Sequence, residues 1–406
     1  MNTTPTLNPT LVQHASWLDG CHEEMIELLI RLCNTNSGTR NLAGLKQVKT
    51  ILADEYAGLH GVQEIVDIDP LVNINDQGNV VTEPLGRMLR ITKHPNAARQ
   101  LVLCIHMDTV YGIEHSFQKC QWLDDNRLNG PGVIDAKGGL VVMLYALKAL
   151  EKSPLAGKVG WTVIINPDEE LGSPGSNQIL RDAAKKADYG LLFEPSLPDG
   201  TLISWRKGIG NFTFVARGRS AHAGRDFDEG RNAVIAISQL MLAIHELNTD
   251  PDITLNVGKI SGGGALNVVP DLGIGRINVR VRTVEQGEQI VERLAALVAE
   301  ANGRDGITVE MHGSFTSPPK EMIPGTEHLQ ALIEKAGDQV GLPVKWKGTG
   351  GGSDGNKFAA EGLANIDSLG PSGGEIHSSN EYLMADSLVP RTKLAALVLM
   401  ALAAEV

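Results

Sequence analysis

The sequence lacks the cysteine spacing that marks disulfide-rich proteins and zinc fingers. Its four cysteines are Cys21, Cys33, Cys104 and Cys120, and no two of them form a CxxC pair. Cys104 stands within the apolar run LVLCI, which predicts a small buried side chain. His22 follows Cys21, but no further ligand follows at zinc-finger spacing. This use of cysteine favours a thiol-tolerant, cytoplasmic setting.

The sequence also lacks the segments that direct a chain into or across a membrane. The first residues, MNTTPTLNPTLVQHASW, contain neither the basic start nor the apolar stretch of a signal peptide. No run of about 18 uninterrupted apolar residues occurs, as a membrane-spanning helix would need. We therefore expect no membrane partner and a cytoplasmic location.

Positive charge is scarce relative to negative charge. The chain has 36 lysines and arginines against 48 aspartates and glutamates, which gives a formal net charge of −12. Because phosphate binding needs a clustered cationic surface, we do not expect nucleic acid as a partner. An anionic substrate would have to be attracted by a local arginine, lysine or metal ion.

The length of 406 residues exceeds one ordinary core, so we expect more than one domain. In the first half, short apolar runs predict strands at 87–93, 100–107, 160–167 and 189–195. Helical spacing of apolar residues predicts helices at 22–34, 43–59 and 138–153. This alternation predicts an α/β fold with a central mixed sheet flanked by helices.

The pattern changes after about residue 207. The order of predicted elements becomes β-α-β-β-α-β, at 210–220, 231–247, 253–263, 273–283, 284–302 and 307–315. This order is the ferredoxin-like split unit. We therefore predict that an α+β domain at 208–317 is inserted between two parts of a larger domain, 1–207 and 318–406. The second part is predicted to end in a helix, RTKLAALVLMALAAE.

Five residues of metal-ligand type follow apolar runs of the larger domain, where strands are predicted to end. They are His106, Asp135, Glu170, Glu194 and His377. Burying such groups without partners costs several kcal/mol, and ligands of α/β sheets gather at the carboxyl ends of strands. Two imidazoles and three carboxylates could share two divalent ions with one carboxylate bridging. The pattern therefore points to a co-catalytic zinc hydrolase.

Each of these residues also has an ordinary explanation when it is taken alone. His106 could be an exposed loop histidine, Asp135 a helix N-cap, and Glu194 a surface charge at the end of a strand. A cap is the weaker explanation for Asp135, because two residues separate it from the glycines that open the helix. Asp108 lies two positions after His106 and so projects to the same face, where its carboxylate would fix the imidazole tautomer.

The adjacent carboxylates Glu169 and Glu170 follow the apolar run TVIINP. A solvated acidic turn is the plain account of this pair. In a zinc hydrolase the two carboxylates would have different roles. One would coordinate the metal, and its neighbour would stay unligated and act as the general base. The metal lowers the pKa of bound water to about 7, and the free carboxylate accepts the proton and passes it to the leaving amine.

Six motifs in series resemble those of the M20 metallopeptidase family. They are HMDTVYG, GPGVIDAKGG, NPDEELGSPGS, FEPS, RSAHAG and GGEIHSS, and they cover nearly the whole chain. The runs HMDTVYG and AGKVGWTVIINPDEE resemble most the glutamate carboxypeptidase (carboxypeptidase G2-like) branch. Acetylornithine deacetylase and succinyl-diaminopimelate desuccinylase are relatives with the same kind of site.

The resemblance implies a role for each candidate residue of the larger domain. Two Zn²⁺ ions per chain are expected, with Co²⁺ as a possible substitute. Asp135 would bridge them, His106 and Glu194 would hold one ion, and Glu170 and His377 would hold the other. Glu169 would act as the general base, Asp108 would orient His106, and the Asp135–Ala136 peptide bond would be cis.

The resemblance also implies that the inserted domain handles the substrate. His222 would reach the active site of a partner subunit in a homodimer, although a surface histidine on a turn is the plain alternative. Asn267 and Arg280 would hold the α-carboxylate of a small substrate. Lys207, beside Arg206, would add positive charge unless it belongs to a hinge surface. Gly352 lies in the loop GTGGGSDGN, which lacks the GK[ST] ending of a phosphate-binding loop.

Three functions are compatible with these residues. The first is a carboxypeptidase that acts on a small substrate with a free carboxylate. The second is an N-acyl-amino-acid deacylase such as acetylornithine deacetylase or succinyl-diaminopimelate desuccinylase. The third is a non-catalytic homologue, which predicts loss of Glu169 or of a ligand, whereas the sequence retains all of them.

Overall fold

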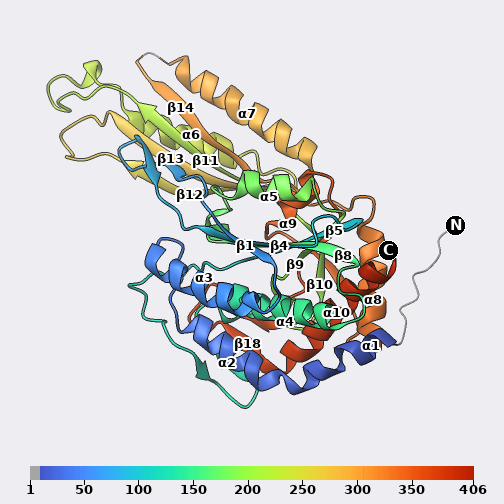
Figure 1. The fold of residues 1–406 in the computed structure, drawn as a ribbon. Coiled ribbons are helices and arrows are strands. Elements are labelled where there is room, and N and C mark those ends of the chain that lie inside the picture. Colours follow the sequence, from blue (N-terminus) through green and yellow to red (C-terminus); the bar gives the residue numbers. More distant parts are fainter. Residues whose placement is uncertain (1–9, 305) are drawn as a thin grey trace.

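A mixed six-stranded sheet forms the centre of the larger part of the molecule (Figure 1). The computed structural model describes residues 10–304 and 306–406. In spatial order the strands are β1 (Val62–Val66), β4 (Met88–Lys93), β8 (Val159–Asn166), β5 (Arg99–His106), β9 (Tyr189–Leu192) and β16 (Asn365–Ile366). The pairs β1–β4 and β4–β8 are antiparallel, and the pairs β8–β5, β5–β9 and β9–β16 are parallel. The predicted central mixed sheet is therefore confirmed.

Helices cover both faces of this sheet. One face carries α1 (Thr10–Ala15), α2 (His22–Cys33), α3 (Leu42–Ala57), α4 (Gly138–Lys152), α8 (Thr326–Gln339) and α10 (Leu388–Ala404). The other carries α5 (Asn177–Ala184) and α9 (Gly355–Ala360). The helix α4 is apolar on all sides because it is sandwiched between the sheet and α10.

The C-terminal helix begins three residues before the predicted start. Leu388 opens α10, and Pro390 is accommodated in its first turn, where its missing amide hydrogen costs nothing. The stretch Ala385–Ala404 is long and apolar enough to cross a membrane, but 72% of its apolar window is buried against the rest of the protein. Its position in the core of the larger part explains why this helix is so rich in apolar residues. Cytoplasmic location and the absence of a membrane partner remain predictions.

Shorter elements complete the larger part. The strands are the hairpin β2 (Leu71–Ile74) and β3 (Val80–Glu83), the parallel pair β10 (Leu202–Arg206) and β15 (Trp346–Thr349), and the small sheet β17 (Gly373–Gly374), β18 (Tyr382–Met384), β7 (Arg127–Asn129) and β6 (Gln121–Trp122). Short helical turns of the larger part are η1 (Ser16–Gly20), η2 (Val133–Lys137), η3 (Glu169–Leu171) and η5 (Ala385–Ser387), whereas η4 (Phe227–Glu229) lies within the segment 208–317. Two of these turns, η2 and η3, carry candidate metal ligands.

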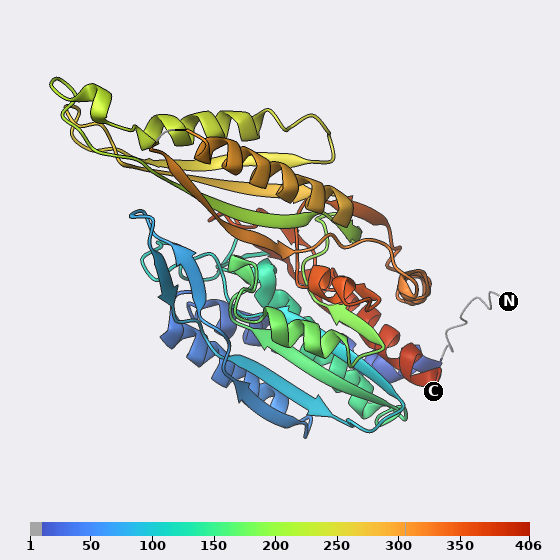
Figure 2. The ribbon, with the colours of Figure 1, turned by 90° about the horizontal axis from the view of Figure 1, so that it is seen from above.

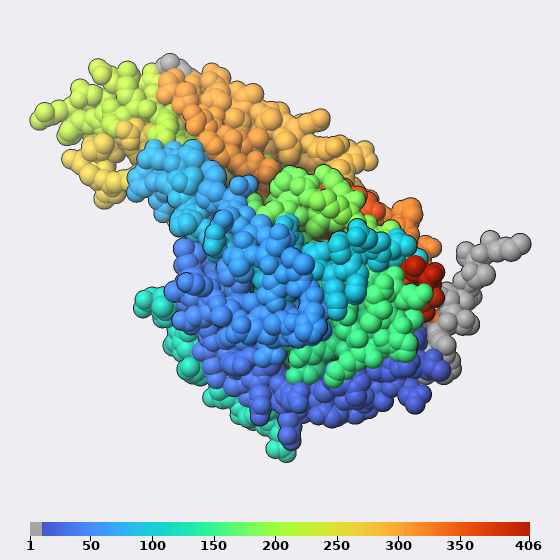
Figure 3. Space-filling view, in the orientation of Figure 1, coloured from blue at the N-terminus to red at the C-terminus, as the bar shows by residue number. Residues whose placement is uncertain are grey.

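A second, antiparallel sheet projects from the larger part (Figures 1 and 3). Its spatial order is β12 (Thr254–Gly262), β13 (Leu272–Val281), β11 (Gly208–Arg217) and β14 (Thr308–Ser317), with α6 (Ala233–His245) and α7 (Val284–Asn302) on one face (Figure 2). Thr283 and Gln286 form a capping box that fixes the start of α7. The chain order β-α-β-β-α-β matches the prediction, and β11 and β14 begin and end at its limits. Separate domain behaviour remains a prediction.

The opposite face of this sheet meets the β2–β3 hairpin of the larger part (Figure 2). Ile74 of the hairpin packs with Val215 and Ile274 of the sheet in a small buried cluster. Asp76, at the tip, forms ion pairs with Lys259 and Arg276 at 2.8 and 2.9 Å. The inserted unit is therefore held at a second place besides its two covalent connections.

The two covalent connections lie side by side and share one anchor. Arg206 and Lys320, one on each connection, exchange backbone hydrogen bonds of 3.1 and 3.0 Å. The side-chain amide of Asn356 donates to the carbonyls of both connections, at Lys207 (3.1 Å) and Pro318 (2.7 Å). These contacts fix where the inserted unit leaves the larger part.

The prediction that all five candidate ligands end strands is wrong for most of them. His106 is the last residue of β5, whereas Glu170 lies in η3 and Glu194 two residues beyond β9. The run before Asp135 forms no strand, because Gly132 has a φ of +71° and the chain turns directly into α4. His377 lies in a loop with a φ of +61°. The ligands share one edge of the sheet, but loops present most of them.

Candidate active site

A cleft between the larger part and the inserted sheet collects most of the candidate site residues. Its volume is about 750 Å³, a size that suits a small substrate. Four of the five candidate ligands line it, together with Glu169, Arg280 and Gly352 of the other candidates. The fifth ligand, His106, lies fully buried behind Asp135 and Glu194. Loops and turns of the larger part thus face strands of the inserted sheet across the cleft.

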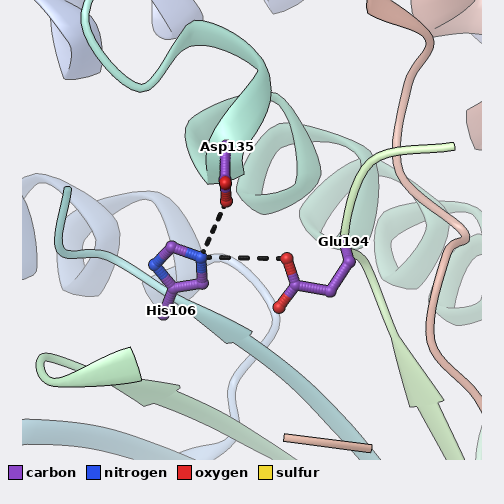
Figure 4. A group of neighbouring side chains, drawn as sticks. All are labelled: His106, Asp135 and Glu194. Carbon is purple, nitrogen blue, oxygen red and sulfur yellow. Dashed lines mark hydrogen bonds and ion pairs between the residues drawn. The ribbon is translucent and has the colours of Figure 1, made fainter. Parts of the chain in front are cut away.

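His106, Asp135 and Glu194 form the first group of ligand atoms (Figure 4). The imidazole Nε2 of His106 lies 3.1 Å from Oδ1 of Asp135 and 3.8 Å from Oε2 of Glu194. Its Nδ1 lies 3.0 Å from the backbone carbonyl of Asp108. When Nδ1–H donates to that carbonyl, the Nε2 lone pair faces the two carboxylates and is free to bind a cation.

Asp135, Glu170 and His377 form the second group. The Nε2 of His377 lies 3.3 Å from Oδ2 of Asp135 and 3.3 Å from Oε2 of Glu170. The two carboxylate oxygens of Asp135 are therefore directed to different histidines. In both groups the candidate ligand atoms lie within 4.8 Å of one another. The Asp135–Ala136 peptide bond is cis, as the resemblance implied.

The donor set of these two groups fits divalent metal ions. Imidazole nitrogens and carboxylate oxygens are the ligands that zinc prefers apart from thiolate. Oε1 of Glu170 is buried and has no hydrogen-bond partner among the described residues. Burial raises the pKa of Glu194 to about 8, and burial together with the charge of Asp135 raises the pKa of Glu170 to about 7. Bound cations would relieve this crowding of negative charge.

Glu169 lies in the same cleft but belongs to neither ligand group. Burial raises the pKa of its carboxyl group well above the usual value. Among the described residues no side chain or backbone group donates a hydrogen bond to its carboxylate. A half-buried carboxylate that faces the cleft without a partner is suited to exchange a proton with a reacting group.

Asp108 is fully buried and contacts both the strand that ends at His106 and the turn that carries Glu169 and Glu170. Its Oδ1 lies 3.3 Å from Nδ1 of His106, the contact that the sequence suggested. Its carboxylate also accepts hydrogen bonds from the backbone amides of Glu169 (3.1 Å) and Glu170 (3.2 Å) and from the hydroxyl of Thr39 (2.7 Å). Asp108 thus ties the His106 strand to the turn that carries both glutamates. Residue spacing did not reveal this second set of contacts.

The predicted substrate residues divide into two groups. Arg280 and Gly352 line the cleft, and a Cβ at Gly352 would lie 2.4 Å from Cδ1 of Ile209, so a larger residue there would require the Ile209 side chain to move. Lys207 does not line it, since its ammonium group lies 3.5 Å from the carbonyl of Pro251. The side chain of Lys207 thus does not reach the cleft in this structure, and its contact with substrate remains a prediction. Adjacent side chains of an extended chain point to opposite sides, and the neighbour Arg206 faces the cleft instead.

His222 and Asn267 lie together, away from the cleft of their own chain. Both are exposed, and the amide of Ala223 donates to the carbonyl of Asn267 at 2.9 Å. Neither residue lines the cleft. Within one chain, the structure therefore does not bring the two residues to the candidate ligands.

The chain matches known peptidases over most of its length. The sequence model described as Peptidase family M20/M25/M40 matches residues 102–401. The chain belongs to the M20 family of peptidases. It is 28% identical over 396 residues to carboxypeptidase G2 of Pseudomonas sp. (strain RS-16), which covers 94% of this chain and 89% of that protein.

Solved structures of peptidases share the fold. A metallo-carboxypeptidase from Sulfolobus solfataricus has a TM-score of 0.73 at 15% identity and covers 94% of this chain and 99% of its own. A tripeptidase from Staphylococcus aureus has a TM-score of 0.71 at 20% identity, with 94% and 98% covered. The protein is thus a hydrolytic enzyme of a metallopeptidase family, and divalent metal use follows from its membership.

Proposed function

We propose that this M20 enzyme is a di-zinc carboxypeptidase of the glutamate carboxypeptidase type. The observation that carries the proposal is the position of Asp135, whose two oxygens face two separate histidines, His106 and His377. Glu170 and Glu194 complete one group each, and Co²⁺ is expected to substitute for Zn²⁺. The similarity to carboxypeptidase G2 over nearly the whole chain supports this type of activity.

The residues of the cleft divide the work of amide hydrolysis. Divalent ions, when bound, polarise the scissile carbonyl and lower the pKa of water. Glu169 accepts the proton of the attacking water and delivers it to the leaving nitrogen, because its carboxylate faces the cleft without a partner. Asp108 holds Glu169 in place through the backbone amide. Arg280 holds the free carboxylate of the substrate by charge-assisted hydrogen bonds.

An N-acyl-amino-acid deacylase is the second candidate function. The same Arg280 would hold the carboxylate of an N-acyl amino acid, and the same Glu169 would protonate its nitrogen. A screen of zinc- and cobalt-loaded protein separates the two functions. It contains dipeptides with acidic C-terminal residues, folyl-glutamates, N-acetylornithine and other N-acyl amino acids. Preferred cleavage of peptides and folyl-glutamates supports the carboxypeptidase, whereas preferred cleavage of N-acetylornithine would replace it by the deacylase.

The variant Glu169→Ala tests the mechanism common to both functions. We expect turnover to fall by about 10²–10⁴-fold, since general acid–base catalysis contributes on this scale. Bound zinc is expected to stay near two per chain, because Glu169 belongs to neither ligand group. Metal content by elemental analysis and turnover are measured on the same sample. Retained activity would remove Glu169 as the base, and a loss of zinc would make it a ligand.

A homodimer is the remaining part of the proposal. His222 and Asn267 are expected to serve the cleft of a partner subunit, since both are exposed and lie outside the cleft of their own chain.

A further inference from the structure

One buried carboxylate outside the proposed ligand set accepts four hydrogen bonds. Glu381 is fully buried, and its Oε1 accepts from the backbone amides of Ile134 (3.0 Å) and Asp135 (3.1 Å). Its Oε2 accepts from the amide of Gly132 (3.2 Å) and from the hydroxyl of Tyr111 (2.6 Å). Three of the four donors are therefore main-chain groups of the segment that ends at the bridging aspartate.

These contacts join three segments that each carry a candidate ligand. Tyr111 follows the strand that ends at His106, and its hydroxyl also lies 2.8 Å from the carbonyl of Ser378. Glu381 itself stands four residues after His377, and its backbone amide donates to the carbonyl of Ser378 at 3.0 Å. The loops that present Asp135 and His377 thus have Glu381 as their common contact.

The local backbone explains why such a contact is needed. The segment around Asp135 has no regular helical or strand geometry, so its amides lack the partners that a helix or sheet would supply. His377 sits at the exposed end of an irregular loop with 53% of its side chain accessible. Without a shared anchor, each loop would shift independently and the distance between the two ligands would vary.

We propose that Glu381 is a positioning residue that sets the separation of Asp135 and His377 and so the affinity of the cleft for divalent ions. This inference rests on the proposed metal centre. Partners that orient metal ligands change metal affinity by about 10–100-fold when they are removed. Glu381 acts on the Asp135 loop by accepting hydrogen bonds from its backbone amides, and on the His377 loop because it is itself part of that loop. It is not proposed as a ligand of the ion.

The variant Glu381→Gln removes the charge and one acceptor while keeping the shape. Zn²⁺ affinity is measured by equilibrium dialysis against a competing chelator, and the absorption spectrum of the Co²⁺-loaded protein reports the geometry of the ligands. We expect Zn²⁺ affinity to fall by about 10–100-fold and the cobalt spectrum to change. Tyr111→Phe removes a single hydrogen bond, so we expect a smaller loss of affinity in the same direction.

Glu151→Gln is the matched control. Glu151 is also a largely buried carboxylate with hydrogen-bond donors, Trp161 and Lys93, but it lies outside the cleft. Its substitution should leave zinc affinity and the cobalt spectrum unchanged. Unchanged affinity and spectrum in Glu381→Gln would overturn the inference. If that variant does not fold, an unchanged Tyr111→Phe overturns it. A wild-type protein that binds no Zn²⁺ would instead overturn the proposed metal centre itself, and this inference with it.

Discussion

Arg280 is the residue whose surroundings argue most directly for an anionic substrate. Its guanidinium donates to Asn278 (2.8 Å) and to the carbonyl of Gly350 (3.2 Å), and it forms no ion pair among the described residues. Burial lowers the pKa of Arg280, because removal from water disfavours its charged form. Every second side chain of β13 faces the cleft side, so Arg280 and Asn278 point the same way.

Replacing Arg280 with glutamine should therefore weaken substrate binding. Hydrogen bonds to charged groups contribute about 1.5–3 kcal/mol, so we expect kcat/KM to fall by about 10–150-fold, mainly through KM. Arg282→Gln is the control, because Arg282 lies two residues further and stacks on Trp205 at 3.9 Å instead of lining the cleft. Equal losses in both variants, or a loss in kcat alone, would contradict the assigned role.

Unlike Arg280, which forms no ion pair among the described residues, the buried carboxylate of Asp367 pairs with two cations. Its Oδ2 lies 2.8 Å from Nε of Arg206 and 2.9 Å from Nζ of Lys320, and it accepts from the hydroxyl of Ser353 at 3.0 Å. Burial alone would raise the pKa of Asp367, but the two cations hold it at about 2. The carboxylate therefore stays charged and joins the two covalent connections to the larger part.

Asp367→Asn leaves Arg206 and Lys320 buried without an anion, and we expect a loss of about 3–5 kcal/mol in the free energy of unfolding. Because the pKa of Asp367 is lower in the folded state, its contribution is complete above about pH 4 and is lost as the pH falls toward 2. The difference between wild type and variant should narrow over that range in urea unfolding. A difference that is constant with pH would contradict the ion-pair account, and Lys207→Gln should change stability little.

The sequence predicted the ligand candidates because their residue types are chemically distinctive. His106 and Glu194 follow strands that the apolar pattern predicted correctly, so the sheet brings them together. Glu381 escaped notice because its importance lies in accepting main-chain hydrogen bonds, which leave no trace in spacing or residue type. Residue type alone also did not separate Lys207 from Arg206, because adjacent side chains of an extended segment point to opposite sides and only Arg206 lines the cleft.

At the scale of elements, the β2–β3 hairpin is one part of the larger domain that contacts the inserted sheet. Arg217 donates to the carbonyl of Gly78 at 2.9 Å, and Arg276 donates to that of Ile74 at 3.0 Å. Gly78 has a φ of +71°, and a Cβ there would lie 2.8 Å from Val215. The turn therefore fits against the sheet only because residue 78 has no side chain.

Gly78→Ala should loosen this contact. A left-handed non-glycine residue costs about 1–2 kcal/mol, and the added methyl group also crowds Val215. We expect faster amide hydrogen exchange over residues 71–83 and in β13. Gly112→Ala is the matched control, because Gly112 is exposed and a Cβ there would meet nothing within 4 Å. Unchanged exchange in the hairpin of Gly78→Ala would show that the contact does not hold the sheet.

Most elements were predictable, and the exceptions share a cause. The β-α-β-β-α-β order of the inserted unit follows from alternating apolar residues in its strands and amphipathic helices, and local pattern is sufficient there. The apolar residues before Asp135, Val133 and Ile134, form no strand, since they belong to the irregular turn η2 and are buried in the hydrophobic core instead of pairing in a sheet. An apolar run predicts burial, but only its tertiary partners decide whether it pairs as a strand.

At the scale of the whole molecule, the cleft is formed jointly by the two parts. The larger part supplies the candidate metal ligands and Glu169, whereas the inserted unit supplies Arg280 and Asn278. A rigid relation between the two parts would fix the distance between the reacting amide and the carboxylate that anchors the substrate. The shared anchor at Asn356 and the hairpin contact at Asp76 both act on that relation.

The exposed pair His222 and Asn267 leads to a prediction about assembly. If His222 serves the cleft of a partner, Glu169→Ala and His222→Ala should each be inactive as pure dimers. After unfolding and refolding together, half of the dimers are mixed, and each mixed dimer has one site with an intact Glu169 and the partner's intact His222. We therefore expect about one quarter of wild-type activity to return. Separately refolded variants are the control. No recovery despite verified mixed dimers, or an active monomer at assay concentration, would restrict His222 to the surface of its own chain.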